Sequence, residues 1–175
     1  GHAAMAKYFG WGPSRIVFWG LGGVAINRRP LHRSPKKDMA VSLAGPAVNI
    51  VLAIVAGAVL FGTQGAFATG TLFGEFWRLM FSLNIFWAVF NLLPIFPMDG
   101  GQTLQSALEL RFKSKAKVAR YTGITGIVTI IVALFLAVGP LRLLGAGIFT
   151  VILALYFIYL NYQLIQSKGR PMQWY

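Results

Sequence analysis

The stretch NLLPIFPMDGG, residues 91–101, decides how the rest of the chain is interpreted. It closes an apolar run over residues 76–98, which is long enough to cross a bilayer. Asp99 places a carboxylate at the edge of this predicted span, where an acidic side chain is costly and marks a functional site by default. A plain helix end, capped by the same aspartate and followed by a turn, explains these residues equally well.

Two prolines and two glycines surround this carboxylate. Pro94 and Pro97 remove two backbone donors and disturb a helix. Gly100 and Gly101 allow the backbone to turn and to approach a neighbouring group closely. The sequence therefore predicts a spanning helix that breaks where it presents Asp99.

Composition places the chain among helical membrane proteins. Of its 175 residues, 57% are hydrophobic and 11% are charged, which is too apolar for a soluble domain of this size. Cysteine is absent, so disulfides and thiolate metal sites are excluded. The net charge of +12 does not indicate a nucleic-acid-binding protein, because the basic residues form short clusters between apolar runs, as in the cytoplasmic loops of membrane proteins.

The expected fold is an all-α polytopic membrane protein in the lipid bilayer. Residues 1–9 are interpreted as the end of a preceding span, and residues 102–112 as a short amphipathic helix. Residues 11–27 are β-favouring around a Gly-rich turn and contain two tryptophans, which predicts two short strands at the membrane interface. Four complete transmembrane helices are expected at about residues 41–60, 76–98, 121–138 and 141–160.

The distribution of lysine and arginine predicts the orientation. The expected loops on one side hold 14 of the 16 basic residues, whereas Arg78 and Arg142 fall on the other side. Basic loops are cytoplasmic, so residues 28–37 and 111–120 should face the cytoplasm and residues 61–75 the outside. Asp99 and the first helix then share the cytoplasmic side.

His2 is the best candidate for a partner of Asp99 on that side. It belongs to the small-residue sequence GHAAMA, which is typical of a helix that packs closely in a membrane. A lone histidine there is more often packed or hydrogen-bonded than a ligand, but imidazole and carboxylate are also a common zinc ligand pair. His32, in the basic loop, is expected to be solvated.

Three short motifs resemble those of the site-2 protease family of zinc intramembrane metalloproteases. NLLPIFPMDGG resembles the family's Asn-x-x-Pro and Asp-Gly motif, and SLAGPAVN at residues 42–49 resembles its Gly-Pro-x-x-Asn element. Residues 1–3 resemble the end of its His-Glu-x-Gly-His-Ala motif. Order and spacing agree over about residues 1–110, and the Gly-rich strand pair matches the family's membrane-associated β-hairpin. The resemblance is to the compact bacterial and archaeal branch, in which the zinc lies toward the cytoplasm.

The resemblance implies roles for particular residues. Asp99 would be the third ligand of a Zn2+ ion and His2 the second zinc histidine, so we expect their side chains to approach within about 5 Å. Other motif residues would have structural roles. In the Gly-Pro-x-x-Asn element these are Gly45 and Pro46, and in the Asn-x-x-Pro and Asp-Gly motif they are Pro94, Pro97, Gly100 and Gly101.

Asn49 and Asn91 are the motif asparagines, which in the family are thought to hold the substrate in extended form. Hydrogen bonding between helices is the commoner use of asparagine in membranes, and it stays open here. The family's first histidine and its catalytic glutamate, the general base, would lie upstream of Gly1. The chain therefore contains no catalytic residue of its own, and we expect this piece alone to be inactive.

The resemblance implies a zinc-dependent intramembrane endopeptidase that cleaves transmembrane protein substrates near the cytoplasmic face of a bacterial or archaeal cell membrane, in regulated intramembrane proteolysis. Residues 1–112 would be its catalytic membrane core, and residues 113–175 would add two C-terminal helices and a cytoplasmic tail. A regulatory membrane protein is a further expected partner that the sequence does not identify. The alternative is a catalytically inactive relative that binds or escorts membrane proteins. A small transporter or channel subunit would explain the spans but not the three motifs.

Overall fold

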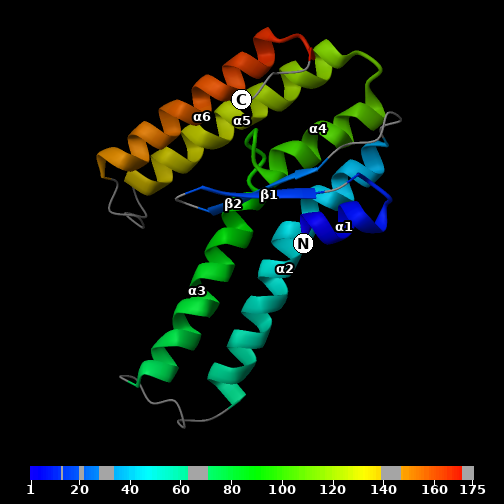
Figure 1. Cartoon of the computed structure of the whole chain (residues 1–175). Coiled ribbons are helices and arrows are strands. Elements are labelled where there is room, and N and C mark those ends of the chain that lie inside the picture. Colours follow the sequence, from blue (N-terminus) through cyan, green and yellow to red (C-terminus); the bar gives the residue numbers. More distant parts are fainter. Residues whose placement is uncertain (13, 20–21, 28–33, 63–70, 139–146, 171–175) are drawn as a thin grey trace. The chain divides into compact units, whose positions relative to one another are not determined.

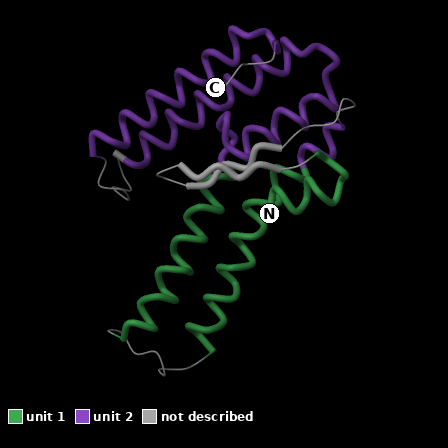
Figure 2. The backbone as a smooth tube through the Cα atoms, in the orientation of Figure 1, with its two compact units in different colours: residues 1–32, 40–92 green, residues 33–39, 93–175 purple. Residues whose placement is uncertain are grey.

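The computed structural model describes the chain except for residues 13, 20–21, 28–33, 63–70, 139–146 and 171–175 (Figure 1). The chain divides into two compact units, residues 1–32 with 40–92 and residues 33–39 with 93–175 (Figure 2). The predicted division of the chain into a catalytic core, residues 1–112, and a C-terminal part, residues 113–175, is not tested by these units.

The first unit begins with the short helix α1 (His2–Tyr8) and the strands β1 (Ser14–Trp19) and β2 (Gly22–Asn27). The strands pair antiparallel, with Ser14 opposite Asn27 and Trp19 opposite Gly22. Their place at a membrane interface stays a prediction. Residues 20–21, which connect the strands, lie outside the described residues, whereas Gly22 and Gly23 begin β2.

Two long helices complete this unit: α2 (Pro35–Gly62), which begins in the second unit, and α3 (Leu72–Leu92). Apolar side chains join α1 to the start of α2, where Ala6, Trp11 and Val41 form a buried cluster. Near its end, α2 meets α3 at Phe81, whose ring packs edge-on against Phe61. The part of α2 that belongs to this unit is therefore packed near both of its ends, at Val41 and at Phe61.

The end of α3 corrects one prediction. The apolar run predicts a span through residue 98, but the helix ends at Leu92. Pro94 explains the difference, because proline disfavours the helical conformation of the residue before it and lacks the amide that a helix would use. The apolar run thus divides into a helix and a loop at residues 93–98, in which Ile95 is buried and the other residues are half-buried.

The second unit contains α4 (Asp99–Arg111), α5 (Lys115–Val138) and α6 (Ile148–Gln166). Helices α5 and α6 run antiparallel, side by side, and α4 packs on α5 (Figure 1). The predicted amphipathic helix at residues 102–112 instead begins at Asp99, after Met98 in an extended conformation. A carboxylate in the first turn stabilises the positive end of the helix dipole.

The core of this unit includes the loop before α4. Ile95 of the loop, Ile130 of α5 and Ala154 of α6 form one buried cluster, with Leu93 and Met98 packed against it. The loop that carries the motif is thus part of the core and rests on both C-terminal helices.

Three of the described helices are long and apolar enough to cross a membrane: Pro35–Gly62, Lys115–Ala137 and Ile148–Gln166. This confirms the helical membrane class that the composition predicts. The sequence predicts four spans, however, and α3 as a span stays a prediction, because Glu75, Arg78 and two asparagines lower the apolar character of its 21 residues. The start of the predicted fourth span at residue 141 lies outside the described residues, and the helix there is described from Ile148.

Candidate functional site

His2 is the first residue of α1, and its ring is held by the backbone of α2. The Nδ1 atom lies 2.8 Å from the carbonyl oxygen of Val41. A carbonyl oxygen only accepts hydrogen bonds, so Nδ1 is the donor and carries the proton. In the neutral ring Nε2 is then the basic nitrogen. Zinc-binding histidines commonly have this arrangement, in which a hydrogen bond from one ring nitrogen fixes the tautomer for the other.

Gly45 provides the space in which this ring lies. Val41 and Gly45 are one turn apart on the same face of α2. A Cβ atom placed on Gly45 would lie 2.1 Å from Nε2 and 2.4 Å from Cε1 of His2. A side chain at this position would therefore displace the imidazole, which gives the predicted motif glycine a physical role.

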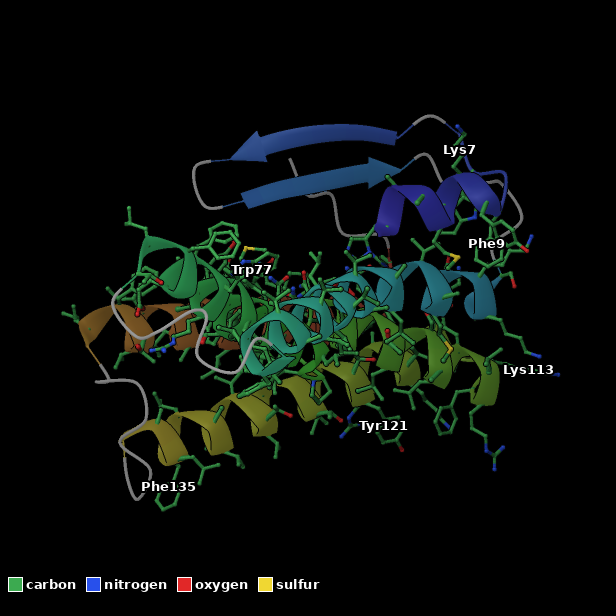
Figure 3. All side chains as sticks on the ribbon, turned by 90° about the horizontal axis from the view of Figure 1, so that it is seen from below. Lys7, Phe9, Trp77, Lys113, Tyr121 and Phe135 are labelled. Carbon is green, nitrogen blue, oxygen red and sulfur yellow. The ribbon has the colours of Figure 1, made fainter. Side chains whose placement is uncertain are left out.

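Pro46 follows inside α2 and is fully buried. Because proline lacks an amide hydrogen, the carbonyl group one turn earlier loses its helical donor. Figure 3 shows α1, with Lys7 and Phe9 near its end, lying along α2. The Gly-Pro pair thus lies where the histidine helix meets α2.

The motif asparagines are half-buried. Asn49 lies one further turn along the face of α2 that carries Gly45. Neither Asn49 nor Asn91 has a side-chain hydrogen bond to any residue that the structure describes. By contrast, Asn84 of α3 donates to the carbonyl oxygen of Met80 in its own helix, at 2.7 Å. The structural use of a membrane asparagine is thus seen at Asn84 and not at the two motif positions.

Asp99 is the first residue of α4, directly after the loop of residues 93–98. Short backbone hydrogen bonds shape this loop, from the Ile95 amide to Leu93 at 2.7 Å and from the Met98 amide to Ile95 at 2.8 Å. The peptide bond before Pro97 is cis. Gln102 donates from Nε2 to the Pro97 carbonyl oxygen at 2.9 Å, so a side chain of α4 also holds the loop.

The two glycines after Asp99 are buried. A Cβ atom on Gly101 would lie 2.5 Å from the carbonyl carbon and oxygen of Ile95. The loop backbone therefore folds directly over the first turn of α4, and a residue with a side chain would push it away. Pro94 and Pro97, both half-buried, belong to the same loop.

Asn161 of α6 is a site residue that the motifs do not predict. Its side chain is fully buried. Its Oδ1 accepts from the Phe96 amide at 3.2 Å, and its Nδ2 donates to the Phe96 carbonyl oxygen at 2.7 Å. A lone asparagine in an apolar span is a sequence signal for function in membranes, but the signal does not name its partner.

The donor chemistry of the chain fits part of a zinc site. His2 has a fixed tautomer that suits a ligand, and Asp99 supplies a carboxylate, a ligand type that zinc accepts. Within the described ranges, no three His, Cys, Asp or Glu side chains come together in a way that could hold a metal. His2 belongs to the first unit and Asp99 to the second, so the predicted approach of their side chains stays a prediction. His32 lies outside the described residues.

Comparison with known proteins tests the family resemblance. The family model of Peptidase family M50 matches residues 1–136. The zinc metalloprotease MJ0392 of Methanocaldococcus jannaschii is 32% identical over 116 residues, which are 64% of this chain and 31% of that protein. Stage IV sporulation protein FB of Bacillus subtilis is 34% identical over 104 residues, or 59% of this chain and 34% of that protein. The chain thus spans about a third of the length of these two relatives. It is an integral membrane protein, and it belongs to Peptidase family M50, which confirms the resemblance to the site-2 proteases.

Proposed function

We propose that the chain is the membrane core of a zinc-dependent intramembrane endopeptidase of the site-2 type. The observation that carries this proposal is the geometry around His2. A histidine at the end of a motif of this family donates from Nδ1 to Val41, and its ring lies over a motif glycine. A ring held by the backbone in one tautomer is prepared to be a metal ligand through its other nitrogen.

His2 and Asp99 are the two zinc ligands that this chain contributes. The support is the order of the motifs, the family match over residues 1–136 and the donor types. A zinc ion bound with one open position would polarise the scissile carbonyl group and activate a water molecule. Both the third protein ligand and the general base are expected from the His-Glu part of the family motif. Glu75 is unsuited to replace them, because it is exposed and lies 3.7 Å from Arg78.

The substrates are transmembrane proteins whose cleavage site is held in extended form. The two motif asparagines are suited to this task, since each offers a donor and an acceptor within a membrane protein. The absence of hydrogen bonds from Asn49 and Asn91 to the described residues supports a ligand rather than a neighbouring helix as their partner. Polar groups inside a bilayer bind an extended peptide backbone well, because no water competes there.

The site faces the cytoplasm of a bacterial or archaeal cell membrane. The support is the concentration of lysine and arginine in the loops that flank the motifs and the preference of such loops for the cytoplasm. The relatives named above are archaeal and bacterial proteins. Regulated cleavage, with a second membrane protein as regulator, belongs to the same proposal.

Replacement of Asp99 by alanine in the full-length protein tests the proposal. The purified protein should bind about one zinc ion and cleave a transmembrane substrate. Asp99→Ala should lose the activity and most of the zinc. Glu109→Gln is the matched control, because it removes another carboxylate of the same helix α4, and it should keep both. Unchanged zinc content and cleavage in Asp99→Ala would contradict the proposal, and zinc binding without cleavage in the unmodified protein would favour an inactive relative.

A further inference from the structure

The carboxamide of Asn161 is bonded to both backbone groups of one loop residue. Oδ1 accepts from the Phe96 amide, and Nδ2 donates to the Phe96 carbonyl oxygen and to the carbonyl oxygen of Phe157 one turn earlier in α6. The side chain thus supplies the Phe96 backbone with the hydrogen-bond partners that a neighbouring strand or helix turn would otherwise provide. The bonds to Phe96 join positions 65 residues apart in the chain.

The carboxamide itself has little room to move. A Cβ atom placed on Gly126 of α5 would lie 2.1 Å from Oδ1 and 2.7 Å from Cγ of Asn161. Glycine at this position lets the amide lie directly on α5. The Asn161 side chain is therefore enclosed by α5 on one side and tied to the loop on another, while its own helix supplies a third hydrogen-bond partner.

Phe96 is three residues before Asp99, and the chain between them is short and well fixed. The Met98 amide bonds to Ile95, and Gln102 holds the Pro97 carbonyl oxygen. A displacement of Phe96 therefore passes to the first turn of α4, because Gly101 lies in direct contact with the Ile95–Phe96 peptide. Side chains that lie outside a metal site but orient its ligands change metal affinity by about 10-fold to 100-fold when they are removed.

We infer that Asn161 is a positioning residue that fixes the loop of residues 93–98 and so sets the position of the Asp99 carboxylate. The inference rests on the proposed zinc site. It gives the C-terminal helix α6, which lies outside the matched residues 1–136, a direct part in forming that site. Asn161 touches neither metal nor substrate in this role, because it acts through the Phe96 backbone.

The test compares Asn161→Ala with Asn84→Ala in the full-length protein. Both variants remove an asparagine of a long helix that donates to a carbonyl oxygen of its own helix, but only Asn161 also bonds to the loop. Asn161→Ala should weaken zinc binding about 10-fold to 100-fold, change the visible spectrum of the cobalt-substituted protein and accelerate hydrogen exchange at the Phe96 amide. Asn84→Ala should leave zinc affinity and the cobalt spectrum unchanged, even where it lowers the melting temperature.

Gly126→Ala is the second variant, and it carries the test if Asn161→Ala fails to fold. It keeps every polar atom but pushes the carboxamide away from α5, so it should produce the same change in spectrum with a smaller loss of zinc affinity. Asp99→Ala in the same series separates the two proposals. If Asp99→Ala loses zinc while Asn161→Ala and Gly126→Ala keep the zinc affinity and cobalt spectrum of the unmodified protein, the positioning role is wrong and the zinc site stands. If Asp99→Ala also keeps its zinc, the proposed function itself is wrong.

Discussion

Replacing Gly45 by alanine in the full-length protein should weaken zinc binding without destabilising the fold. The new Cβ atom would lie 2.1 Å from Nε2 of His2, so the ring must retreat by about 1.3 Å to reach an ordinary contact of 3.4 Å. Such a movement also stretches the 2.8 Å hydrogen bond to Val41. A displacement of about 1 Å in a catalytic group can lower the rate about 100-fold, and we expect an effect of this size on cleavage.

The change in stability should be small because two effects oppose each other. Loss of the bond between His2 and Val41 costs about 1 kcal/mol. Alanine is favoured over glycine inside a helix by about 1 kcal/mol, and Gly45 lies inside α2. The melting temperature should therefore stay nearly constant while function falls, which distinguishes this variant from one that simply unfolds.

The assay combines zinc retention against a series of chelators, thermal unfolding and cleavage of a membrane substrate. Gly62→Ala at the end of the same helix is the control, since a Cβ atom there meets nothing within 4 Å. It should leave zinc affinity and cleavage unchanged. Zinc affinity and cleavage in Gly45→Ala equal to those of the control would refute the assignment of His2 as a ligand held over Gly45.

Three further predictions follow from the same features. Cysteines placed at Thr69 and Ser114 should be labelled from opposite sides of the membrane, and labelling from one side would contradict the predicted orientation. Asn49→Ala should lower cleavage about 100-fold, as expected for a lost positioning contact. Its melting temperature should change little, since a membrane hydrogen bond contributes about 0.6 kcal/mol on average. Asn84→Ala provides the comparison, and equal losses of stability and activity in Asn49→Ala would indicate a structural role. Gln102→Leu should destabilise the protein by about 1 kcal/mol through the lost hydrogen bond to the preceding loop, and denaturation midpoints equal to those of the unmodified protein would show that the bond contributes nothing.

The sequence was sufficient to predict features that depend on local composition. Apolar length indicated the helices α2, α5 and α6, and the glycines and prolines indicated that α3 would break before Asp99. The boundaries were less accurate, because residues 93–98 are as apolar as the helix before them. Their apolar side chains serve the core of the second unit, where Ile95 is 3% exposed, and not a continuation of the span.

Features that depend on distant contacts could not be predicted. Asn84 and Asn161 are both asparagines in apolar helices, and nothing in the neighbouring sequence separates them. Only the fold shows that one bonds within its helix and the other holds a loop 65 residues earlier. The reason for Gly45 was likewise inaccessible, since the motif names the glycine but the contact with His2 follows from the packing of α1 on α2.

Gly45 and Gly126 show how this chain can hold polar groups inside apolar helices. A polar side chain in a membrane must find its hydrogen-bond partners within the protein. His2 finds one in a backbone carbonyl of α2, and Asn161 finds two in the Phe96 backbone, and each lies directly on a glycine of a long helix. A glycine removes the Cβ atom that would hold the polar group away, as small residues do generally at helix contacts in membranes. Because an enlarged side chain at either glycine moves a polar group rather than a lipid-facing one, substitutions there should impair zinc binding before they impair folding.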